Sequence, residues 1–265
     1  MKRISLLLSL LTSSLALAYN YTEDFNSGFY WQTLPVNLTI IPSGAPTQDS
    51  AILEKTLGAA SEWNAVTQVP IFNISSSGDS ANLIRCSRNF ESEPACKNMK
   101  DANGNVTCRN NTTLAITTRY TEYTYMARTE IILNDDYFRL CQKADSKSSD
   151  LYTIVLHELG HVVGLGHSED ESAIMYPQIG DLNELGQDDV EGMQSLVATT
   201  LGYQQTGYVS ALANKQEETN ALGCGTVALD QNSSGGMGGP LSFALTLLAG
   251  FGLIKVARKS VKVFA

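Results

Sequence analysis

Apolar and polar residues alternate over residues 35–41, where β-branched side chains are also frequent. A period of two places one face of an extended segment on a core, so this stretch predicts a β-strand. Residues 69–74, 114–119 and 129–133 are three further strand candidates. All four strand signals come before residue 134.

A helical spacing marks three other stretches. Residues 47–66 carry apolar side chains near a period of 3.6, and residues 150–164 contain an apolar run that suits a helix buried against a sheet. Residues 188–197 begin with two aspartates, which favour a helix N-terminus, and present an apolar face. Strands that precede helices, with one early helical crossover, indicate an α+β domain over about residues 22–200.

Residues 75–113 are polar, rich in Asn and Ser, and contain three of the five cysteines. We expect a long surface insertion pinned by disulfides rather than a packed element. In an oxidising compartment the first four cysteines form two disulfides, in one of three connectivities; they are Cys86, Cys96, Cys108 and Cys141. A cysteine zinc site is the alternative, but the spacings are irregular and no C-x-x-C motif occurs. Cys224 is left over, and it pairs between chains, stays free or is modified.

The first residues, 1–18, have the three parts of a secretory signal peptide. A basic start and an apolar run are followed by the small residues Ala16 and Ala18 at the cleavage position. A membrane anchor is the alternative, but the apolar run is short and no stop-transfer flank follows it. The sequence therefore predicts export, with the main domain over residues 19–200.

The C-terminal part has a different composition. Residues 201–239 are expected to be a linker that ends in a Gly- and Ser-rich stretch. Residues 240–265 combine an apolar segment with a basic tail. The apolar segment is short for a membrane-spanning helix, which needs about 17–25 residues, and a buried helix is the alternative. We expect membrane contact through this segment, which is transient if the tail is removed. The order of its parts resembles the Gly-Gly C-terminal sorting signals of bacteria.

Charge narrows the class of partner. Both ends lack acidic residues, so removing their six basic residues leaves 12 Lys and Arg against 27 Asp and Glu, a net charge of about −15. An acidic exported domain repels the phosphate backbone, and nucleic acid is therefore excluded as a partner.

One eleven-residue segment, residues 157–167, contains all three histidines of the chain. His157 and His161 are four residues apart, so a helix places both imidazoles on one face. Gly164 can adopt the positive φ that ends such a helix, and the chain can then turn back so that His167 supplies a third nitrogen. Glu158 lies beside the first histidine, where its carboxylate can reach a water without ligating the metal.

Three nitrogen ligands with an open fourth position are typical of a catalytic zinc site, whereas a structural site is closed by a fourth protein ligand. Zinc lowers the pKa of its water and polarises a carbonyl, and Glu158 takes the proton as general base. An H-E-x-x-H match alone can be accidental. Here the longer motif is intact and no histidine is left over, so we predict one catalytic zinc ion.

The extended motif resembles the signature of the metzincin metallopeptidases. The second mark of that class is a methionine in a tight turn beneath the metal, and Met175 within residues 172–177 is similar to it. Ser168, directly after the third histidine, and residues 185–194, which open the last helix, resemble the matrixins. The chain is therefore identified as matrixin-like, of a bacterial type.

This resemblance implies a metzincin-like α+β catalytic domain, with a mixed twisted sheet, an active-site helix and a C-terminal helix. An edge strand at residues 114–119 would bind an extended peptide by strand addition, and Met175 would support the base of the metal site. The substrate pocket implied in the same way would be formed by Leu114, Ala115, Ile116, Pro177, Gln178 and Ile179. Matrixins usually have tyrosine where Ile179 stands, so the shape of this pocket would differ.

The chain also departs from the animal matrixins. No cysteine-switch propeptide is expected before the domain, so latency through a cysteine on zinc is not expected unless Cys224 provides it. A histidine-bearing structural zinc site is excluded because no histidine remains. Acidic residues and Asn leave room for calcium sites, although no EF-hand loop occurs. The cysteine-bearing insertion has no counterpart in the resemblance.

The leading interpretation is a secreted or cell-surface zinc endopeptidase that acts on protein or peptide substrates. A processing enzyme dedicated to one surface protein is a narrower version of it. The alternative from a different class is a catalytically silent binding module on a metzincin scaffold. The intact Glu158 argues against that module, because a pure scaffold needs no general base.

Overall fold

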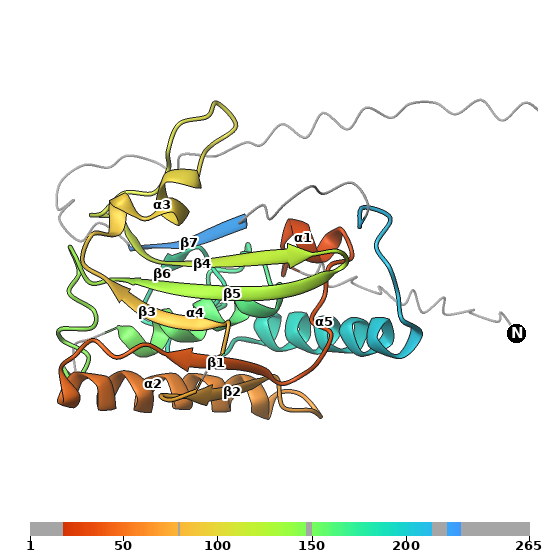
Figure 1. Ribbon diagram of the computed structural model, residues 1–265, viewed down its shortest axis with the longest axis horizontal. Coiled ribbons are helices and arrows are strands. Elements are labelled where there is room, and N and C mark those ends of the chain that lie inside the picture. The colour runs from red at the N-terminus through yellow and green to blue at the C-terminus, as the bar shows by residue number, and fades with distance from the viewer. Residues whose placement is uncertain (1–17, 79, 147–149, 214–221, 229–265) are drawn as a thin grey trace, which may run out of the picture. The chain divides into compact units, whose positions relative to one another are not determined.

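The computed structural model describes residues 18–78, 80–146, 150–213 and 222–228 (Figure 1). Its strands form one mixed sheet in the order β2-β1-β3-β5-β4-β7-β6. The strands are β1 (Val36–Ile40), β2 (Phe72–Ser75), β3 (Leu83–Ser87), β4 (Thr113–Glu122), β5 (Tyr125–Asn134), β6 (Gln178–Ile179) and β7 (Leu222–Ala228). Strands β1, β2, β3 and β5 run parallel, and β4 is antiparallel to both of its neighbours.

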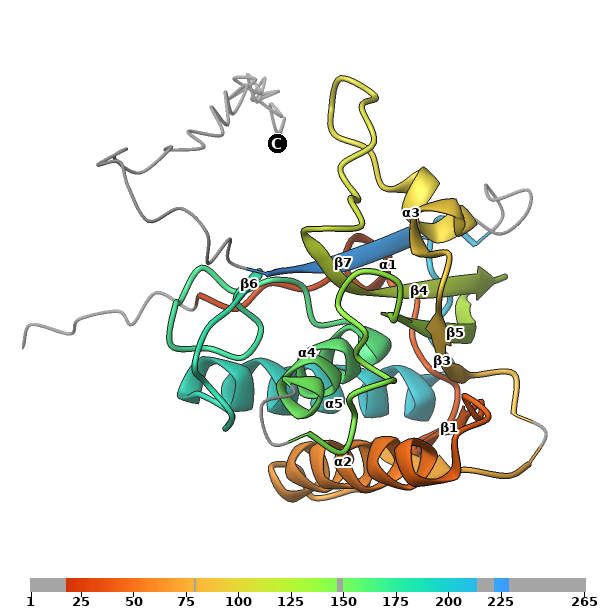
Figure 2. The ribbon, with the colours of Figure 1, turned by 90° about the vertical axis from the view of Figure 1, so that its left-hand side faces the viewer.

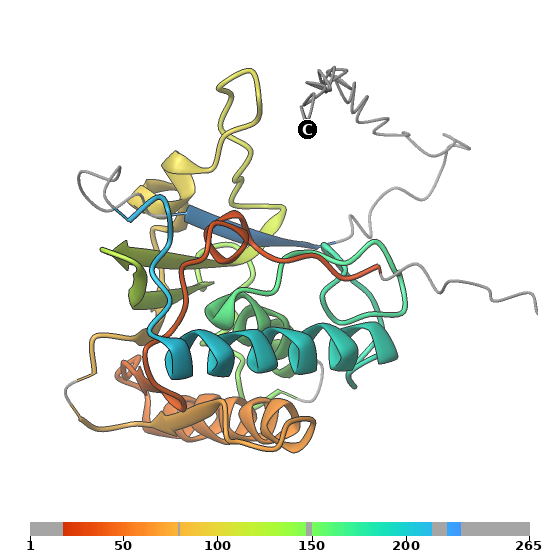
Figure 3. The same ribbon diagram turned by 90° about the vertical axis from the view of Figure 1, so that its right-hand side faces the viewer.

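Three long helices lie on one side of the sheet, namely α2 (Pro46–Ala65), α4 (Leu151–Val163) and α5 (Gln187–Thr206) (Figures 1 and 3). The short helices are α1 (Glu23–Asn26), the 3-10 turn η1 (Phe90–Ser92) and α3 (Pro94–Asn98). The predicted α+β architecture is confirmed, because each predicted strand and helix overlaps an observed one. Helix α5 continues past its predicted end at residue 197.

Helix α4 lies in the interior, between the sheet and the other helices. Every residue from Ile154 to Val163 is buried, as expected for a helix that is apolar on nearly all sides. Gly164 ends the helix with φ at 117°. A Cβ at this position would lie 3.0 Å from the side chain of Phe25, so both the turn and the packing require glycine.

The prediction that residues 75–113 form only a surface insertion is wrong, because β3 lies within them. Strand β3 pairs in parallel with β1 and with β5. Its polar appearance has a local cause, since Arg85 is paired with Glu93 at 2.8 Å and with Glu130 at 2.5 Å. The rest of the insertion covers the opposite face of the sheet, over a small apolar cluster of Phe90, Ala95, Cys96, Cys108, Ile116 and Ile132.

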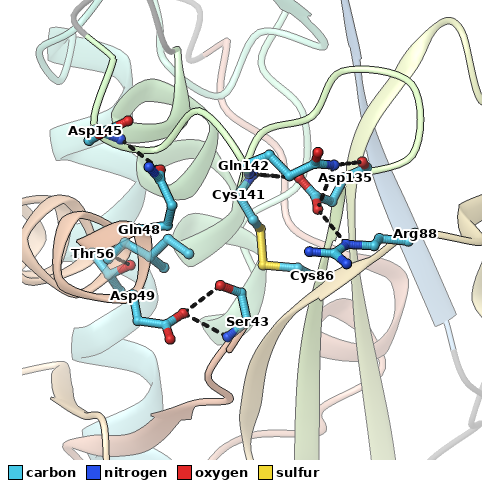
Figure 4. Close-up of a disulfide and its surroundings, with 11 residues drawn as sticks. Ser43, Gln48, Asp49, Thr56, Cys86, Arg88, Asp135, Cys141, Gln142 and Asp145 are labelled. Carbon is cyan, nitrogen blue, oxygen red and sulfur yellow. Dashed lines mark hydrogen bonds and ion pairs between the residues drawn. A yellow bond between two sulfur atoms is a disulfide. The ribbon is translucent and has the colours of Figure 1, made fainter. Parts of the chain in front are cut away.

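The first four cysteines form two disulfides, as predicted, with the pairing Cys86–Cys141 and Cys96–Cys108. The first disulfide joins β3 to the loop that precedes α4 (Figure 4). In that loop the Asp135 carboxylate accepts hydrogen bonds from the backbone N–H of Cys141 and Gln142, both at 2.9 Å. Sequence separations of 55 and 12 residues correspond to stabilisation of about 4 and about 3 kcal/mol through loop-closure entropy.

The segment expected to be a linker, residues 201–239, belongs in part to the folded domain. Residues 201–206 complete α5, and β7 joins the sheet. Because β7 pairs with β4, β4 is not the edge strand that the family resemblance implied. The predicted signal peptide up to residue 17 and the C-terminal segment 240–265 lie outside the described residues. Among the helices that the structure describes, none has the length and apolar character needed to cross a membrane.

Candidate metal centre

The three histidines converge on one point beside α4. His157 and His161 lie on the helix, and His167 comes from the loop that follows Gly164. The Nε2 atoms of His157 and His161 are 3.0 Å apart, and one ring nitrogen of each of the three residues lies within 4.8 Å of the others. The fold thus brings together the three residues that the sequence predicts as ligands.

The Nδ1 atom of each helical histidine faces a backbone carbonyl. His157 Nδ1 is 2.6 Å from the oxygen of Ile174, and His161 Nδ1 is 2.7 Å from the oxygen of Leu165. A carbonyl oxygen can only accept, so the Nδ1 atom carries the proton and donates it. The Nε2 atom keeps its lone pair, which is the tautomer that a metal ligand needs.

Burial keeps the three imidazoles neutral. It lowers the pKa of His157 to about 3 and the pKa of His167 to about 4, and it lowers the pKa of His161 well below its usual range. The neighbouring imidazoles lower the pKa of His157 and His161 further, because adjacent cations would repel each other. At neutral pH all three rings are in the form that binds a metal ion.

Glu158 is fully buried and reaches from α4 to the sheet. The Thr117 hydroxyl on β4 donates a hydrogen bond to Glu158 Oε2 at 2.5 Å. Thr117 therefore fixes the carboxylate on the side of β4 that faces α4. Sequence reasoning missed Thr117, because nothing local marks it apart from the other threonines of this strand.

The loop after His167 passes back beneath the histidines. Met175 packs directly against α4, since a Cβ added at Gly160 would be 2.4 Å from its sulfur atom. The backbone oxygen of Met175 accepts a hydrogen bond from the Ser168 N–H at 2.9 Å. Met175 therefore packs against the histidine helix, and glycine at position 160 leaves the space for it.

Asp189 connects this loop to α5. Its buried carboxylate accepts hydrogen bonds from the N–H groups of Ile174 at 2.7 Å, Met175 at 3.0 Å and Gly186 at 2.8 Å. Ile174 is also the residue whose carbonyl orients His157. Asp189 on α5 therefore helps to position His157 through Ile174. Burial raises the pKa of Asp189 although these bonds oppose the shift. The sequence marks this residue only as favourable at a helix N-terminus.

Asp188, its neighbour, connects the loop to the start of the described chain. One carboxylate oxygen accepts a hydrogen bond from the Ser168 hydroxyl at 2.7 Å. The other accepts from the backbone N–H of Ala18 at 3.0 Å and of Tyr19 at 2.9 Å. Asp188 thus connects Ser168, directly after His167, both to the start of the described chain and to the start of α5.

A buried ion pair supports α4 from the sheet side. Arg119 Nε lies 2.7 Å from Asp24 Oδ2, and the two side chains are 3% and 2% exposed. Arg119 Nη1 also donates a hydrogen bond to the backbone oxygen of His161 at 3.0 Å. The pair therefore fixes the helix at its second histidine.

The six residues predicted for the substrate pocket are not on one surface. Leu114 and Ala115 belong to the main core, and Ile179 packs against it. Ile116 lies in the cluster under the insertion, because alternation along the strand turns it to the face opposite to that of Ala115 and Thr117. Gln178 and Ile179 form β6, directly after Pro177 and beyond β7. Only part of the predicted set therefore lies on the histidine side.

A mixed α+β domain with buried neutral histidines on a helix and its following loop, and with a methionine beneath them, defines a metzincin-type metallopeptidase domain. The model of one family, the matrixins, matches residues 31–198, which is more than half of the chain. This protein belongs to the matrixin family.

Curated relatives match over shorter stretches. The chain is 54% identical to Metalloendoproteinase 5-MMP of Arabidopsis thaliana over 50 residues, which are 18% of this chain and 14% of the relative. It is 50% identical to the macrophage metalloelastase of Oryctolagus cuniculus over 54 residues, 19% and 12% of the two chains. Stromelysin-1 of Mus musculus is 36% identical over 96 residues, which are 34% of this chain and 20% of the relative. The matched stretches thus cover at most a fifth of these relatives.

The histidine cluster fits zinc, the metal of the matrixin family. Tetrahedral zinc with nitrogen ligands at about 2.0–2.1 Å keeps those nitrogens roughly 3.3 Å from one another, and the His157 and His161 nitrogens are 3.0 Å apart. The neutral rings and the fixed tautomers supply the lone pairs. Calcium binding stays a prediction from composition.

Proposed function

We propose that this protein is a zinc-dependent endopeptidase, with His157, His161 and His167 as metal ligands and Glu158 as general base. The observation that carries the proposal is the convergence of three neutral imidazoles beside a buried carboxylate. A structural zinc site needs a fourth protein ligand, whereas these three side chains leave one position for water. A catalytically silent module has no use for the carboxylate.

The residues divide the chemistry among them. His157, His161 and His167 would hold the zinc ion, which when bound would supply a Lewis acid that acidifies water and polarises a carbonyl. Glu158 takes the proton of the attacking water and returns it to the leaving amine, which completes hydrolysis of the peptide bond. Thr117 holds the Glu158 carboxylate in place, and the carbonyls of Ile174 and Leu165 hold the proton on Nδ1 of His157 and His161.

Replacing Glu158 with Gln tests this assignment, because it removes the base and keeps the shape of the side chain. We expect hydrolysis of a fluorogenic peptide library to fall by about 10²- to 10⁴-fold, with one zinc ion still bound per chain. Glu169→Gln is the matched control, since Glu169 is an exposed carboxylate two residues beyond His167. Stoichiometric zinc without cleavage by the unchanged protein would favour the silent module instead.

We further propose that the protein is exported and acts on proteins or peptides outside the cell. Cleavage after Ala18 would create an α-amino group at Tyr19, whose nitrogen lies 2.9 Å from Asp188, and this contact supports a mature domain that starts there. The bacterial sorting tail and transient membrane contact through residues 240–265 stay predictions from the sequence. Mass spectrometry of the mature protein tests both termini.

A further inference from the structure

Strand β7 lies in a slot between β4 and β6. It pairs antiparallel with β4, with Cys224 opposite Thr117 and Thr226 opposite Ala115. It pairs parallel with β6, with Val227 opposite Gln178. The sheet order thus places β7 between the two strands, and Figures 1 and 2 show it below the helix α3 of the insertion. Among the described residues, β6 joins the sheet only through β7.

The slot is one strand wide. Neighbouring strands lie about 4.8 Å apart, so β4 and β6 are separated by roughly twice that distance and cannot pair with each other. Without β7, β4 would present a row of unpaired backbone groups, which is a template for any extended chain. The backbone of Cys224 lies opposite the residue that contacts Glu158. Helix α4 also lies close to β7.

An extended segment in this slot has both of its backbone sides paired and passes along the histidine helix. This is the position that a peptide substrate must take if the proposed function is right, because strand addition to β4 brings a peptide bond to Glu158. The segment that fills it belongs to the same chain. Its sequence, Leu222–Ala228, contains no charged residue and two glycines.

We propose that residues 222–228 are a built-in competitor that occupies the peptide-binding slot and must leave before a substrate can bind. This inference rests on the proposed function and states how the peptidase activity is regulated. Only residues 214–221 separate β7 from the described chain that precedes it, and short connections give effective concentrations on the order of 1 mM. A segment that binds with a dissociation constant of about 10–100 μM would then raise the KM for substrate by about 10- to 100-fold.

The test displaces β7 in the full-length protein. Proline at two successive positions, Gly225→Pro with Thr226→Pro, removes one N–H donor on each side of the strand. Gly235→Pro with Gly236→Pro is the control, because it lies beyond β7. For an intramolecular competitor we expect KM to fall about 10- to 100-fold with kcat unchanged, since a saturating substrate already displaces β7. A synthetic peptide of residues 222–228 should then inhibit the variant competitively.

A second form of the experiment avoids any folding defect of the variant. A recognition sequence for an unrelated serine protease, inserted between residues 214 and 221, is cut after the protein has folded. After the cut, β7 is no longer covalently attached to the domain, so its binding depends on the protein concentration. The KM for substrate should therefore fall when the cut protein is diluted. Independently of catalysis, amide hydrogen exchange at residues 115–119 should become faster in the proline variant on a Glu158→Gln background.

The outcomes separate the two proposals. One outcome is that the intact, proline and cut proteins have equal KM values and activities that all depend on Glu158. That result would overturn the competitor and would still support the peptidase. Activity in none of the forms would count against the peptidase. Cleavage of the chain by itself within residues 222–228 would identify β7 as a substrate and would also overturn the competitor.

Discussion

His157 and His161 lie on a helix, whereas His167 and Met175 lie on the loop that follows it, and the two parts of the cluster are held differently. Helix α4 is buried along the whole length of the motif. The loop is held by hydrogen bonds to two carboxylates at the start of α5, those of Asp188 and Asp189.

The difference separates two kinds of stability. Apolar burial contributes about 1.5–3 kcal/mol for each large side chain and is spread over many contacts. Hydrogen bonds to a carboxylate contribute about 1.5–3 kcal/mol each and depend on a few atoms. We therefore expect changes around the helix to act mainly on folding, and changes around the loop to act mainly on metal affinity.

The largest effect is expected at the helix, from Arg119→Met. The substitution leaves Asp24 buried without its partner, which costs about 3–5 kcal/mol of unfolding free energy. Urea unfolding of the metal-free protein measures it. Arg88→Met is the control, because the Arg88 side chain is 67% exposed in its pair with Asp135. We expect this variant to lose only about 0–1 kcal/mol of unfolding free energy. Equal losses for the two variants would contradict the interpretation.

A smaller effect is expected from pH on the metal-free protein. The folded histidines have lowered pKa values, whereas the unfolded ones titrate near about 6.5. The unfolded chain then binds more protons, so the stability present above about pH 6.5 is lost as the pH falls towards about 4. Between pH 7 and 6 we expect a loss of about 2 kcal/mol for the three residues together.

Chemical denaturation at a series of pH values checks this slope. The protein has no histidine outside the cluster, so a variant with glutamine at positions 157, 161 and 167 should lose the slope in this window. The same slope in that variant would show that other groups cause it.

The smallest effect on folding is expected at the loop, from Asp189→Asn. Asparagine has one acceptor oxygen where the carboxylate has two, so part of the bonding to Ile174, Met175 and Gly186 is lost. We expect about 1–2 kcal/mol of unfolding free energy but a loss of about 10- to 100-fold in zinc affinity, because the carbonyl that orients His157 moves. Competition with a chelator measures the affinity. Asp181→Asn, an exposed carboxylate before the same helix, should change neither quantity.

Periodicity in the sequence was sufficient for the long elements, because each carries an apolar stripe that one face must bury. It failed for three strands. Strand β3 contains Arg85, whose charge is balanced by Glu93 and Glu130, and such pairing cannot be seen in one sequence. Strand β6 has two residues, and β7 has a Gly-rich sequence in a segment that looks like a linker.

The same limit applies to the candidate site. The histidines, Glu158 and Met175 follow from a local motif, since a helix and one turn are enough to bring them together. Thr117, Asp24 and Arg119 act through contacts between distant parts of the chain, and Asp24 is 95 residues away from Arg119. Residue type and spacing carry no signal for such pairs, so only the folded sheet reveals them.

The placement of the two tryptophans gives the molecule a spectroscopic reporter. Trp31 and Trp63 are the only tryptophans of the chain, and both are buried. Each donates its indole N–H to a carbonyl of α4, Trp31 to Val162 at 2.9 Å and Trp63 to Leu156 at 2.8 Å. All tryptophan emission therefore comes from rings bonded to the histidine helix. Its wavelength can follow the loosening of that helix without an added label.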